Sequence, residues 1–550
     1  MNLDLTPSEY ESPLEWQNWG EASAIELCEV KIEATSFLIS VSTTPLPPVE
    51  GSSMSLRHLM FFSPMDDSKL YLASSYLDFG DYAAAPKSEL FIHSLARSSA
   101  DESRNWTCIL SARRSYSESV LTYIVLNPGG PTGQGSGLLA GLLKVSGPIP
   151  VNKSQHRSIV IGSTHLLSLP ELAEHESWAP SQVVVPLESA GQELPTHGVL
   201  SPNNTTLLCT STTRLSLQSI PRHKSDVSSM IDLTARIATC LLSGSSAADI
   251  THLLVRSSIT LEVVGQTLHA AFKMVNNGQD KGTLIRRGLG LVLETYRSRA
   301  IQNVSESERL GIRWHTALDV CSLASCKTAF EDCRVDGAFD LDAVWQLVSL
   351  SAWVVSFVEQ LLKDCVLAVA AAESPAVPWY LGHAYTLACL HTVLSDVIQF
   401  RPKSPRAACD VSKLEVLVKE LLAETQSTVP DDESLRCLAF CEATPSMHSH
   451  LQMAAHKLAS QTIVDKTRLF VQRHELMEDG GDVRKERVRD IVTKTALPGA
   501  RTRGLTCVRC GGRSEAARST AQHASDAWKA WEHVWSKHCI CGGMWLAGTQ

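Results

Sequence analysis

The sequence predicts a multidomain protein with a β-rich N-terminal part, an α-helical middle and a small cysteine-rich C-terminus. Seventeen of the 24 prolines lie at or before Pro221, and none lies between Pro221 and Pro375. Proline breaks helix interiors, so this gap permits long helices, whereas the region before it does not. Two close pairs of cysteines then mark the end of the chain. We therefore expect domains at 1–225, 226–500 and 501–550.

The first domain is expected to consist of β-strands. Short runs rich in branched and aromatic residues alternate there with Pro, Gly, Asn and Asp turn signals. Examples of these runs are Leu56–Ser63, Lys69–Tyr76, Glu89–Leu95, Val120–Leu126, Ser158–Gly162, Gln182–Val185, Thr206–Cys209 and Leu215–Ser219. Many short strands without helices between them are typical of an antiparallel sandwich or a propeller. No Trp-Asp repeat signature is present, so the pattern alone leaves both open.

The second domain is expected to be a helical array. Apolar residues recur there at helical spacing. Two such sets are Ile285, Leu289, Val292 and Tyr296, and Leu414, Leu417, Val418 and Leu421. The stretch from Asp342 to Ala372 is apolar on nearly all sides, which predicts a central helix.

Composition excludes several classes of protein. The chain has 550 residues, a formal net charge of -9 and 44% hydrophobic residues, which rules out a mainly disordered chain. The mild acidity argues against a general nucleic-acid coat. The first thirty residues contain seven acids and no Lys or Arg, unlike a signal peptide. The apolar segment Ala343–Val358 is shorter than the roughly 20 residues that a bilayer requires, so we interpret it as a core helix.

The clearest chemical motif is a set of four cysteines near the C-terminus. A soluble, intracellular chain keeps its cysteines as thiols or metal ligands. Cys507 and Cys510 precede two glycines, and 28 residues later Cys539 and Cys541 do the same. Four thiolates in two close pairs suit tetrahedral, structural Zn²⁺. The alternatives are a redox Cys-x-x-Cys or unmetallated thiols. One of the nearby histidines could also replace a cysteine as ligand; these are His523, His533 and His538.

Between the two cysteine pairs, Trp528, Trp531 and Trp535 share one face of an expected helix. Such a face either packs this small unit against the helical domain or anchors a partner protein.

Weaker metal candidates lie elsewhere. One is a group of two cysteines and two histidines: Cys437, Cys441, His448 and His450. Another is a group of cysteines alone: Cys321, Cys326 and Cys333. Buried free cysteines are common, so both groups are more simply explained as core.

The segment 481–518 is basic, with ten Lys or Arg against four Asp or Glu. It is interpreted either as a solvated helix and linker or as a contact with an acidic partner or nucleic acid. Catalytic signatures such as H-E-x-x-H and G-x-S-x-G do not occur, and no acid–histidine pair marks a catalytic site. The sequence therefore gives no support to an enzyme.

The C-terminal motif resembles the end of subunit 16 of the Mediator complex. The residues are Cys507-x-Arg-Cys510-Gly-Gly, then Trp528, Trp531-Glu532 and Trp535, then Cys539-Ile-Cys541-Gly-Gly-Met-Trp545. Two further stretches, Gly198–Thr210 and Ser351–Leu362, resemble a propeller hairpin and a core helix of that family. The resemblance implies an N-terminal WD40-type β-propeller followed by an α-helical domain. The β region is short for a full seven-bladed ring, so the propeller would be incomplete or divergent.

The same resemblance implies a function. The chain would be a nuclear, non-catalytic scaffold in the tail module of Mediator, the coactivator that connects DNA-bound activators to RNA polymerase II. Its partners would be other tail subunits and activators, with RNA polymerase II contacted indirectly and no membrane. The metal ligands would be Cys507, Cys510, Cys539 and Cys541. The alternative is a zinc-dependent nucleic-acid-binding protein that uses the basic 481–518 segment, in particular Arg501, Arg503 and Arg509.

Overall fold

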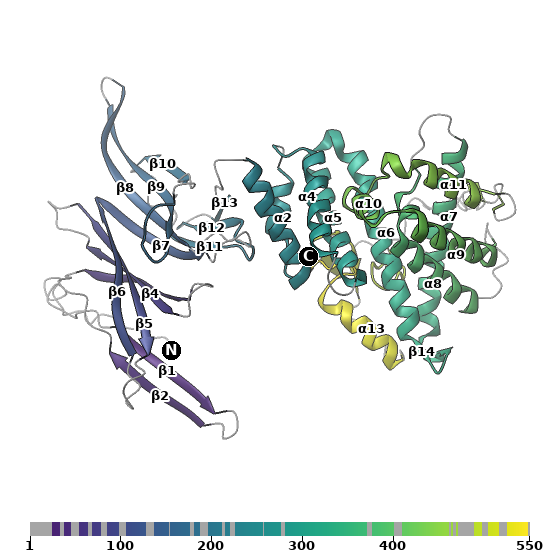
Figure 1. Ribbon diagram of the computed structural model, residues 1–550, viewed down its shortest axis with the longest axis horizontal. Coiled ribbons are helices and arrows are strands. Elements are labelled where there is room, and N and C mark those ends of the chain that lie inside the picture. Colours follow the sequence, from purple (N-terminus) through teal and green to yellow (C-terminus); the bar gives the residue numbers. More distant parts are fainter. Residues whose placement is uncertain are drawn as a thin grey trace. The chain divides into compact units, whose positions relative to one another are not determined.

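The chain divides into two compact units, Met1–Asp232 and Leu233–Gln550, in the computed structural model (Figure 1). The structure describes residues 25–33, 38–45, 54–63, 69–78, 85–97, 106–127, 137–152, 155–175, 181–186, 196–211, 215–219, 226–256, 258–276, 281–370, 377–400, 410–460, 464–465, 469–470, 489–497, 504–515 and 525–547.

The first unit is built from antiparallel strands. They are β1 (Glu26–Glu33), β2 (Leu38–Pro45), β3 (Ser55–Phe62), β4 (Leu70–Asp78), β5 (Lys87–Arg97), β6 (Trp106–Ser117), β7 (Ser119–Asn127), β8 (Gly137–Asn152), β9 (Gln155–Ser168), β10 (Ser181–Pro186), β11 (His197–Leu200), β12 (Thr206–Thr210) and β13 (Leu215–Ser219). Their sheets have the orders β1-β2, β3-β4-β5-β6, β10-β9-β8-β7 and β11-β12-β13. Each sheet is a meander, because strands adjacent in sequence are adjacent in space.

These sheets are joined by apolar layers. Successive side chains of a strand point to opposite faces. Leu72 of β4 accordingly clusters with Leu27 of β1, whereas Tyr71 and Ala73 cluster with Leu138 of β8. The two four-stranded sheets thus enclose one core, and the β1-β2 sheet covers another face.

The same alternation continues into the β11-β12-β13 sheet. Leu139 of β8 clusters with Tyr123 and with Leu207 of β12, on the side opposite to Leu138. The Tyr123 hydroxyl is hydrogen-bonded to Thr164 Oγ1 at 2.8 Å, which satisfies a buried polar group. The prediction of antiparallel sheets is confirmed. The described strands form a series of meanders and do not close into a ring.

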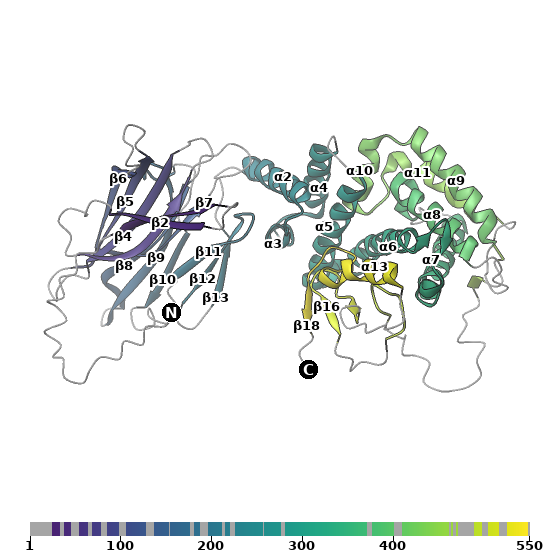
Figure 2. The same cartoon turned by 90° about the horizontal axis from the view of Figure 1, so that it is seen from below.

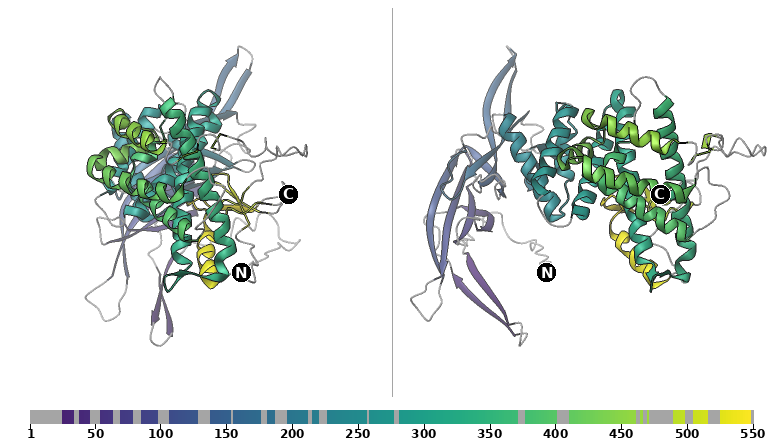
Figure 3. Two further views of the ribbon diagram at one scale, coloured as in Figure 1. Left: turned by 90° about the vertical axis from the view of Figure 1, so that its right-hand side faces the viewer. Right: turned by 45° about the vertical axis from the view of Figure 1, so that its right-hand side comes forward.

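The second unit is helical. Its helices are α2 (Asp226–Ser243), α3 (Ala248–Leu254), α4 (Leu261–Val275), α5 (Lys281–Gln302), α6 (Ser307–Asp332), α7 (Val344–Ala370), α8 (Ala384–Phe400), α9 (Val411–Thr428), α10 (Asp431–Phe440), α11 (His448–Leu458) and α13 (Asp526–Lys537), with 3-10 turns η2 (Val304–Glu306), η3 (Leu341–Ala343), η4 (Trp379–Gly382) and η5 (Pro445–Met447). Short strands add β14 (Arg334–Val335), β15 (Ala338–Phe339), β16 (Leu505–Cys507), β17 (Arg513–Ser514) and β18 (Trp545–Ala547). Figure 3 gives two further views of this array. The predicted helical region is therefore confirmed.

Helix α7 is the apolar helix that the sequence predicts near 342–372. By length and composition it could cross a membrane, although only 39% of its most apolar window is buried. Its buried side, including Leu347, Val354, Leu361 and Cys365, belongs to the core of the helical unit. The core-helix interpretation is thus supported for this side, and the opposite side leaves apolar residues exposed.

Candidate metal centre

The four C-terminal cysteines come together as the sequence predicts. Strands β17, β16 and β18 form a small antiparallel sheet in that order. Cys507 ends β16, and Cys539 and Cys541 follow α13. All four cysteines are buried, and their sulfur atoms lie within 4.8 Å of one another. The Sγ atoms of Cys507 and Cys541 are 3.5 Å apart, and those of Cys510 and Cys539 are 3.6 Å apart.

Each cysteine pair is held in a tight turn that depends on glycine. Gly511 and Gly542 have φ values of +72° and +77°, which disfavour other residues. In the first turn, the Cys510 and Gly512 amides donate to the sulfurs of Cys507 and Cys510. In this first turn the backbone N–H groups thus point toward the sulfurs.

This cluster fits a tetrahedral metal ion. Zn–S bonds near 2.3 Å in a tetrahedron place neighbouring sulfurs about 3.8 Å apart, close to the two distances above. Hydrogen bonds from the sulfurs of Cys510, Cys539 and Cys541 lower the pKa of Cys507. The pKa of Cys541 is raised, first by its hydrogen bond with Cys507. A divalent ion would remove this asymmetry by stabilising all four thiolates.

The two turns that carry the cysteine pairs, at 507–512 and 539–543, pack closely on helix α5. We refer to them as the thiolate turns. A Cβ atom added to Gly290 would lie 2.3 Å from the Cys541 carbonyl oxygen, so only glycine allows this approach. Arg509 Nε donates to Glu294 Oε2 at 2.7 Å, and Arg509 Nη1 donates to the Cys541 carbonyl at 2.9 Å. Arg297 Nη1 donates to the Arg509 carbonyl at 3.1 Å. Both thiolate turns are thereby fixed to one helix more than two hundred residues earlier in the chain.

The tryptophan face of α13 packs against α6 (Figure 2). Trp528 and Trp531 are buried in the core of the helical unit, and Trp531 Nε1 donates to Thr328 Oγ1 at 3.2 Å. Trp545 Nε1 donates to the Trp535 carbonyl at 2.8 Å. The packing interpretation is confirmed for Trp528 and Trp531. Because these two side chains are buried, they do not form an exposed anchor for a partner protein.

A loop at 489–497 packs against the segment that follows the first cysteine pair. Asp490 is fully buried and accepts hydrogen bonds from Ser514 Oγ and the Glu515 amide, as well as from amides of its own loop. Lys494 Nζ donates to Ser322 Oγ and the Ile491 carbonyl and lies 4.8 Å from the centre of the Trp353 ring. Burial lowers the pKa of Lys494. The loop thus joins α6, α7 and the metal centre.

These contacts change the interpretation of the basic segment. Residues 481–488, 498–503 and 516–518, including Arg501 and Arg503, lie outside the described residues. Arg509 pairs with Glu294, and Lys494 is buried, so neither side chain is presented to a nucleic acid. Arg489 and Arg513 remain exposed. Sequence reasoning missed the internal roles of Arg509, Lys494 and Asp490, and only the position of Arg509 between two ligands could have indicated its role.

The weaker metal candidates do not assemble. Among the described residues, no other group of three or more His, Cys, Asp or Glu side chains converges as a metal site would require. Cys437 Sγ contacts the Met447 sulfur at 3.1 Å, and His450 Nε2 is hydrogen-bonded to Thr425 Oγ1. Burial raises the pKa of Cys321 and of Cys326 to about 12, as for core thiols. His523 lies outside the described residues, and His533 and His538 are exposed.

The fold and site together define a protein with an antiparallel β unit and a helical unit, and the core of the helical unit contains a buried cluster of four cysteines that could hold a metal ion. Residues 411–547 match the family described as Mediator complex subunit 16, C-terminal. The chain thus carries a region similar to the C-terminal part of Mediator subunit 16, and this match confirms the resemblance seen in the sequence. The match begins at α9 and includes all four cysteines. A search of curated proteins gave no match.

Proposed function

We propose that this chain is a non-catalytic scaffold in the tail module of Mediator, linking DNA-bound transcriptional activators to RNA polymerase II in the nucleus. The observation that carries the proposal is the family match over 411–547. The site chemistry supports it, because four thiolates that complete a tetrahedral shell leave no open position for a substrate. The partners would be other tail subunits and activators.

The test is affinity purification of the tagged chain from nuclear extract, with mass spectrometry of the co-eluting proteins. Recovery of Mediator tail subunits in near-stoichiometric amounts is the expected result. Cys539→Ser with Cys541→Ser should lose these subunits, whereas Cys108→Ser, in the first unit, should retain them. Recovery of no Mediator subunit by a folded, nuclear chain would overturn the proposal.

We also propose that the ion is structural Zn²⁺, held by Cys507, Cys510, Cys539 and Cys541. Its thiolate bonds would hold together a short segment with few apolar layers of its own; in zinc-finger peptides such binding contributes on the order of 10 kcal/mol.

The divisions 1–225, 226–500 and 501–550 would be the functional parts of the chain. In this arrangement 501–550 folds onto 226–500, because both contribute to one core. Limited proteolysis with and without chelator tests this arrangement.

The first unit is proposed to be part of a WD40-type propeller. Four-stranded meanders packed face to face are the blades of such folds. The outward faces of the first and last sheets expose apolar residues, as unfinished blade stacks would; these are Val30 and Val41 on β1-β2, and Val199 and Leu208 on β11-β12. An electron-microscopy reconstruction of the whole chain in its complex should show a ring or an arc of blades. A two-layer sandwich would contradict this proposal.

The alternative function, zinc-dependent nucleic-acid binding, depends on exposed basic residues. Arg489 and Arg513 are the described candidates. If the alternative holds, DNA affinity falls steeply with salt and the salt dependence weakens in the variant Arg489→Gln with Arg513→Gln. Equally weak DNA binding by the natural chain and by this double variant would reject the nucleic-acid-binding function.

A further inference from the structure

The 3-10 turn η3 and the first turns of helix α7 carry an exposed apolar face. Leu341 is 83% exposed and Trp345 is 82% exposed, and Val348 one turn further is also exposed. The spacing i, i+4, i+7 places the three side chains along one face of the helix, over about 10 Å at 1.5 Å per residue. We refer to Leu341, Trp345 and Val348 as the α7 face. A tryptophan at this level of exposure presents a large apolar area to water.

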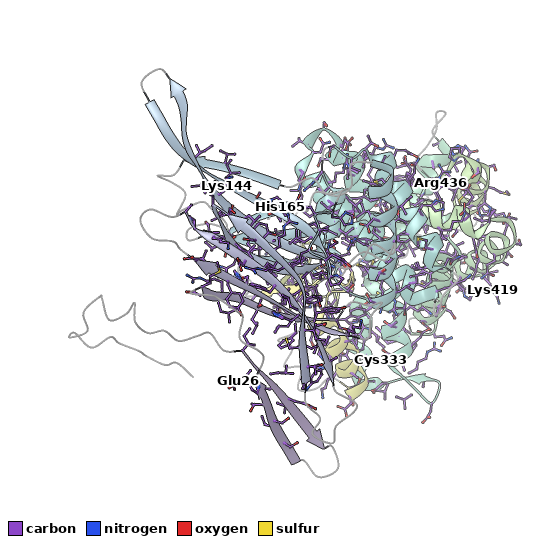
Figure 4. The ribbon with its side chains drawn as sticks, turned by 60° about the vertical axis from the view of Figure 1, so that its left-hand side comes forward. Glu26, Lys144, His165, Cys333, Lys419 and Arg436 are labelled. Carbon is purple, nitrogen blue, oxygen red and sulfur yellow. The ribbon has the colours of Figure 1, made fainter. Side chains whose placement is uncertain are left out.

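The α7 face is held rigidly by the preceding hairpin. Cys333, labelled in Figure 4, follows α6 and accepts a hydrogen bond from the Asp340 amide at 3.0 Å, which closes the β14-β15 turn. The Phe339 ring packs edge-on against Phe330 and Phe400, with centroids 6.0 and 5.6 Å away. The Asp340 side chain accepts from the Asp342 amide and caps η3. The surface is therefore preorganised, which lowers the entropy cost of binding.

Carboxylates outnumber basic groups in the sequence around the α7 face. Between Lys327 and Lys363 there are six Asp or Glu, of which Glu331 pairs with Lys327, and a single Arg. That residue, Arg334, is directed inward to Asp396 Oδ1 at 2.6 Å and Gln399 Oε1 at 2.8 Å. Asp336 and Asp342 are exposed, and within the part of the chain that the structure describes neither forms an ion pair. Apolar side chains bordered by unneutralised carboxylates favour a cationic partner.

We propose that the α7 face docks a basic amphipathic helix supplied by another protein. Leucine-type side chains of that helix would cover Trp345, and its flanking lysines or arginines would face Asp336 and Asp342. A helix suits this surface because residues at i, i+4 and i+7 form a ridge that packs into the groove of a second helix. The proposal goes beyond the Mediator role, because it names a surface and its ligand chemistry on the purified chain.

A lipid surface is the competing explanation for an exposed apolar helix face. The other side of α7 is occupied by the protein core, so the helix does not offer lipid a continuous apolar circumference. Acidic flanks also repel the anionic lipids that attract peripheral proteins. The observations therefore favour a protein helix, and the lipid surface becomes an outcome of the test.

The test uses the full chain and a labelled synthetic amphipathic helix with leucines at helical spacing and lysines on both flanks. Its binding is measured by fluorescence anisotropy against an otherwise identical peptide with glutamate flanks. We expect the basic peptide alone to bind. Trp345→Ser should weaken its affinity at least about tenfold, as for a central aromatic anchor. Asp336→Lys with Asp342→Lys should weaken binding and reduce its salt dependence.

The matched control is Val416→Ser, which replaces an exposed apolar residue on α9 and should leave peptide affinity unchanged. Circular dichroism verifies that each variant is folded. The proposal is overturned by no binding of the basic peptide, by equal binding of both peptides, or by unchanged affinity in Trp345→Ser. Association with phosphatidylcholine vesicles that Trp345→Ser abolishes would also overturn it, in favour of a lipid surface. None of these outcomes depends on recovery of Mediator subunits.

Discussion

Arg509 and Glu294 join the metal centre to the helical array across 215 positions of sequence. Their Nε and Oε2 atoms are 2.7 Å apart, and each side chain is only 13% exposed. The Glu294 carboxylate, acting against the effect of burial, keeps the pKa of Arg509 above its ordinary value. Because Arg509 also donates to the Cys541 carbonyl, one guanidinium bridges α5 and both thiolate turns. The centre is therefore part of the core and not an appended finger.

This pair should behave as a buried ion pair. Removing one partner leaves an uncompensated charge, so Glu294→Gln and Arg509→Met should each lower the free energy of unfolding by about 3 kcal/mol. Urea denaturation followed by circular dichroism measures this change. The double variant should lose less than the sum of the two single variants. Lys281→Met is the control, because its pair with Asp431 is exposed and should contribute less than about 1 kcal/mol. Equal losses in all three single variants would contradict the prediction.

Gly290 should not tolerate a methyl group. At an ordinary helix position Gly→Ala stabilises by roughly 1 kcal/mol. At Gly290 the added Cβ would lie 2.3 Å from a backbone oxygen of the metal centre, so the substitution should destabilise the protein instead. Gly311→Ala in α6 is the matched control, because no atom lies within 4 Å of its added Cβ. Thermal unfolding should shift in opposite directions for the two variants. A stabilised Gly290→Ala would show that the thiolate turns do not dock on α5.

Metal loss should destabilise more than the C-terminal segment. The four cysteines are proposed to hold one structural zinc ion, so the purified chain should contain one equivalent of zinc by elemental analysis. Cys507→Ser with Cys510→Ser should lose this ion and expose Trp528 and Trp531, giving a red-shifted tryptophan emission. Because these tryptophans pack in the core with α6, protease resistance of the helical unit should also fall. Cys108→Ser should keep both the zinc and the emission. Full metal content in the double variant would remove Cys507 and Cys510 from the ligand set.

Much of this architecture follows from local sequence patterns. The distribution of prolines and the apolar periodicity suffice to predict that strands precede helices, because both patterns reflect local backbone preferences. Strand β6 is hard to recognise in the sequence, because its side chains are mostly exposed and polar residues such as Arg113 and Arg114 interrupt the alternation. Strand β8 begins with a glycine-containing stretch, GLLAGLL, which resembles a loop or helix as much as a strand.

The surroundings of the metal centre could not be predicted in the same way. The cysteine pairs are local motifs, so the ligand set was recognisable from spacing alone. Glu294 and Gly290 lie on α5 and carry no sign of a partner in their own segment. Lys494 and Arg509 were counted as part of a basic segment, although tertiary packing turns both inward. Net charge along a sequence does not show which charges are paired in the fold.

His383 provides the pH dependence. Burial lowers the pKa of this histidine to about 4, partly opposed by Asp431, from an ordinary value of 6.5. Between pH 6.5 and 4, His383 is therefore protonated in the unfolded chain but neutral in the folded chain. The free energy of unfolding consequently decreases as pH falls through this window. Relative to His383→Gln, the chain should lose about 2 kcal/mol of unfolding free energy between pH 7 and pH 5, at 1.36 kcal/mol per pKa unit.

The comparison with the variant is needed because other groups titrate with the opposite sign. Burial raises the pKa of Asp319 to about 6, so the folded chain holds that proton more tightly and loses stability as pH rises from 3.8 to 6. This contribution is common to both proteins and cancels in the difference. His456→Gln, which replaces an exposed histidine of α11, supplies the measured baseline. Urea unfolding at several pH values gives each free energy. A flat difference, or one that grows in favour of the natural chain at low pH, would mean that His383 is protonated in the fold.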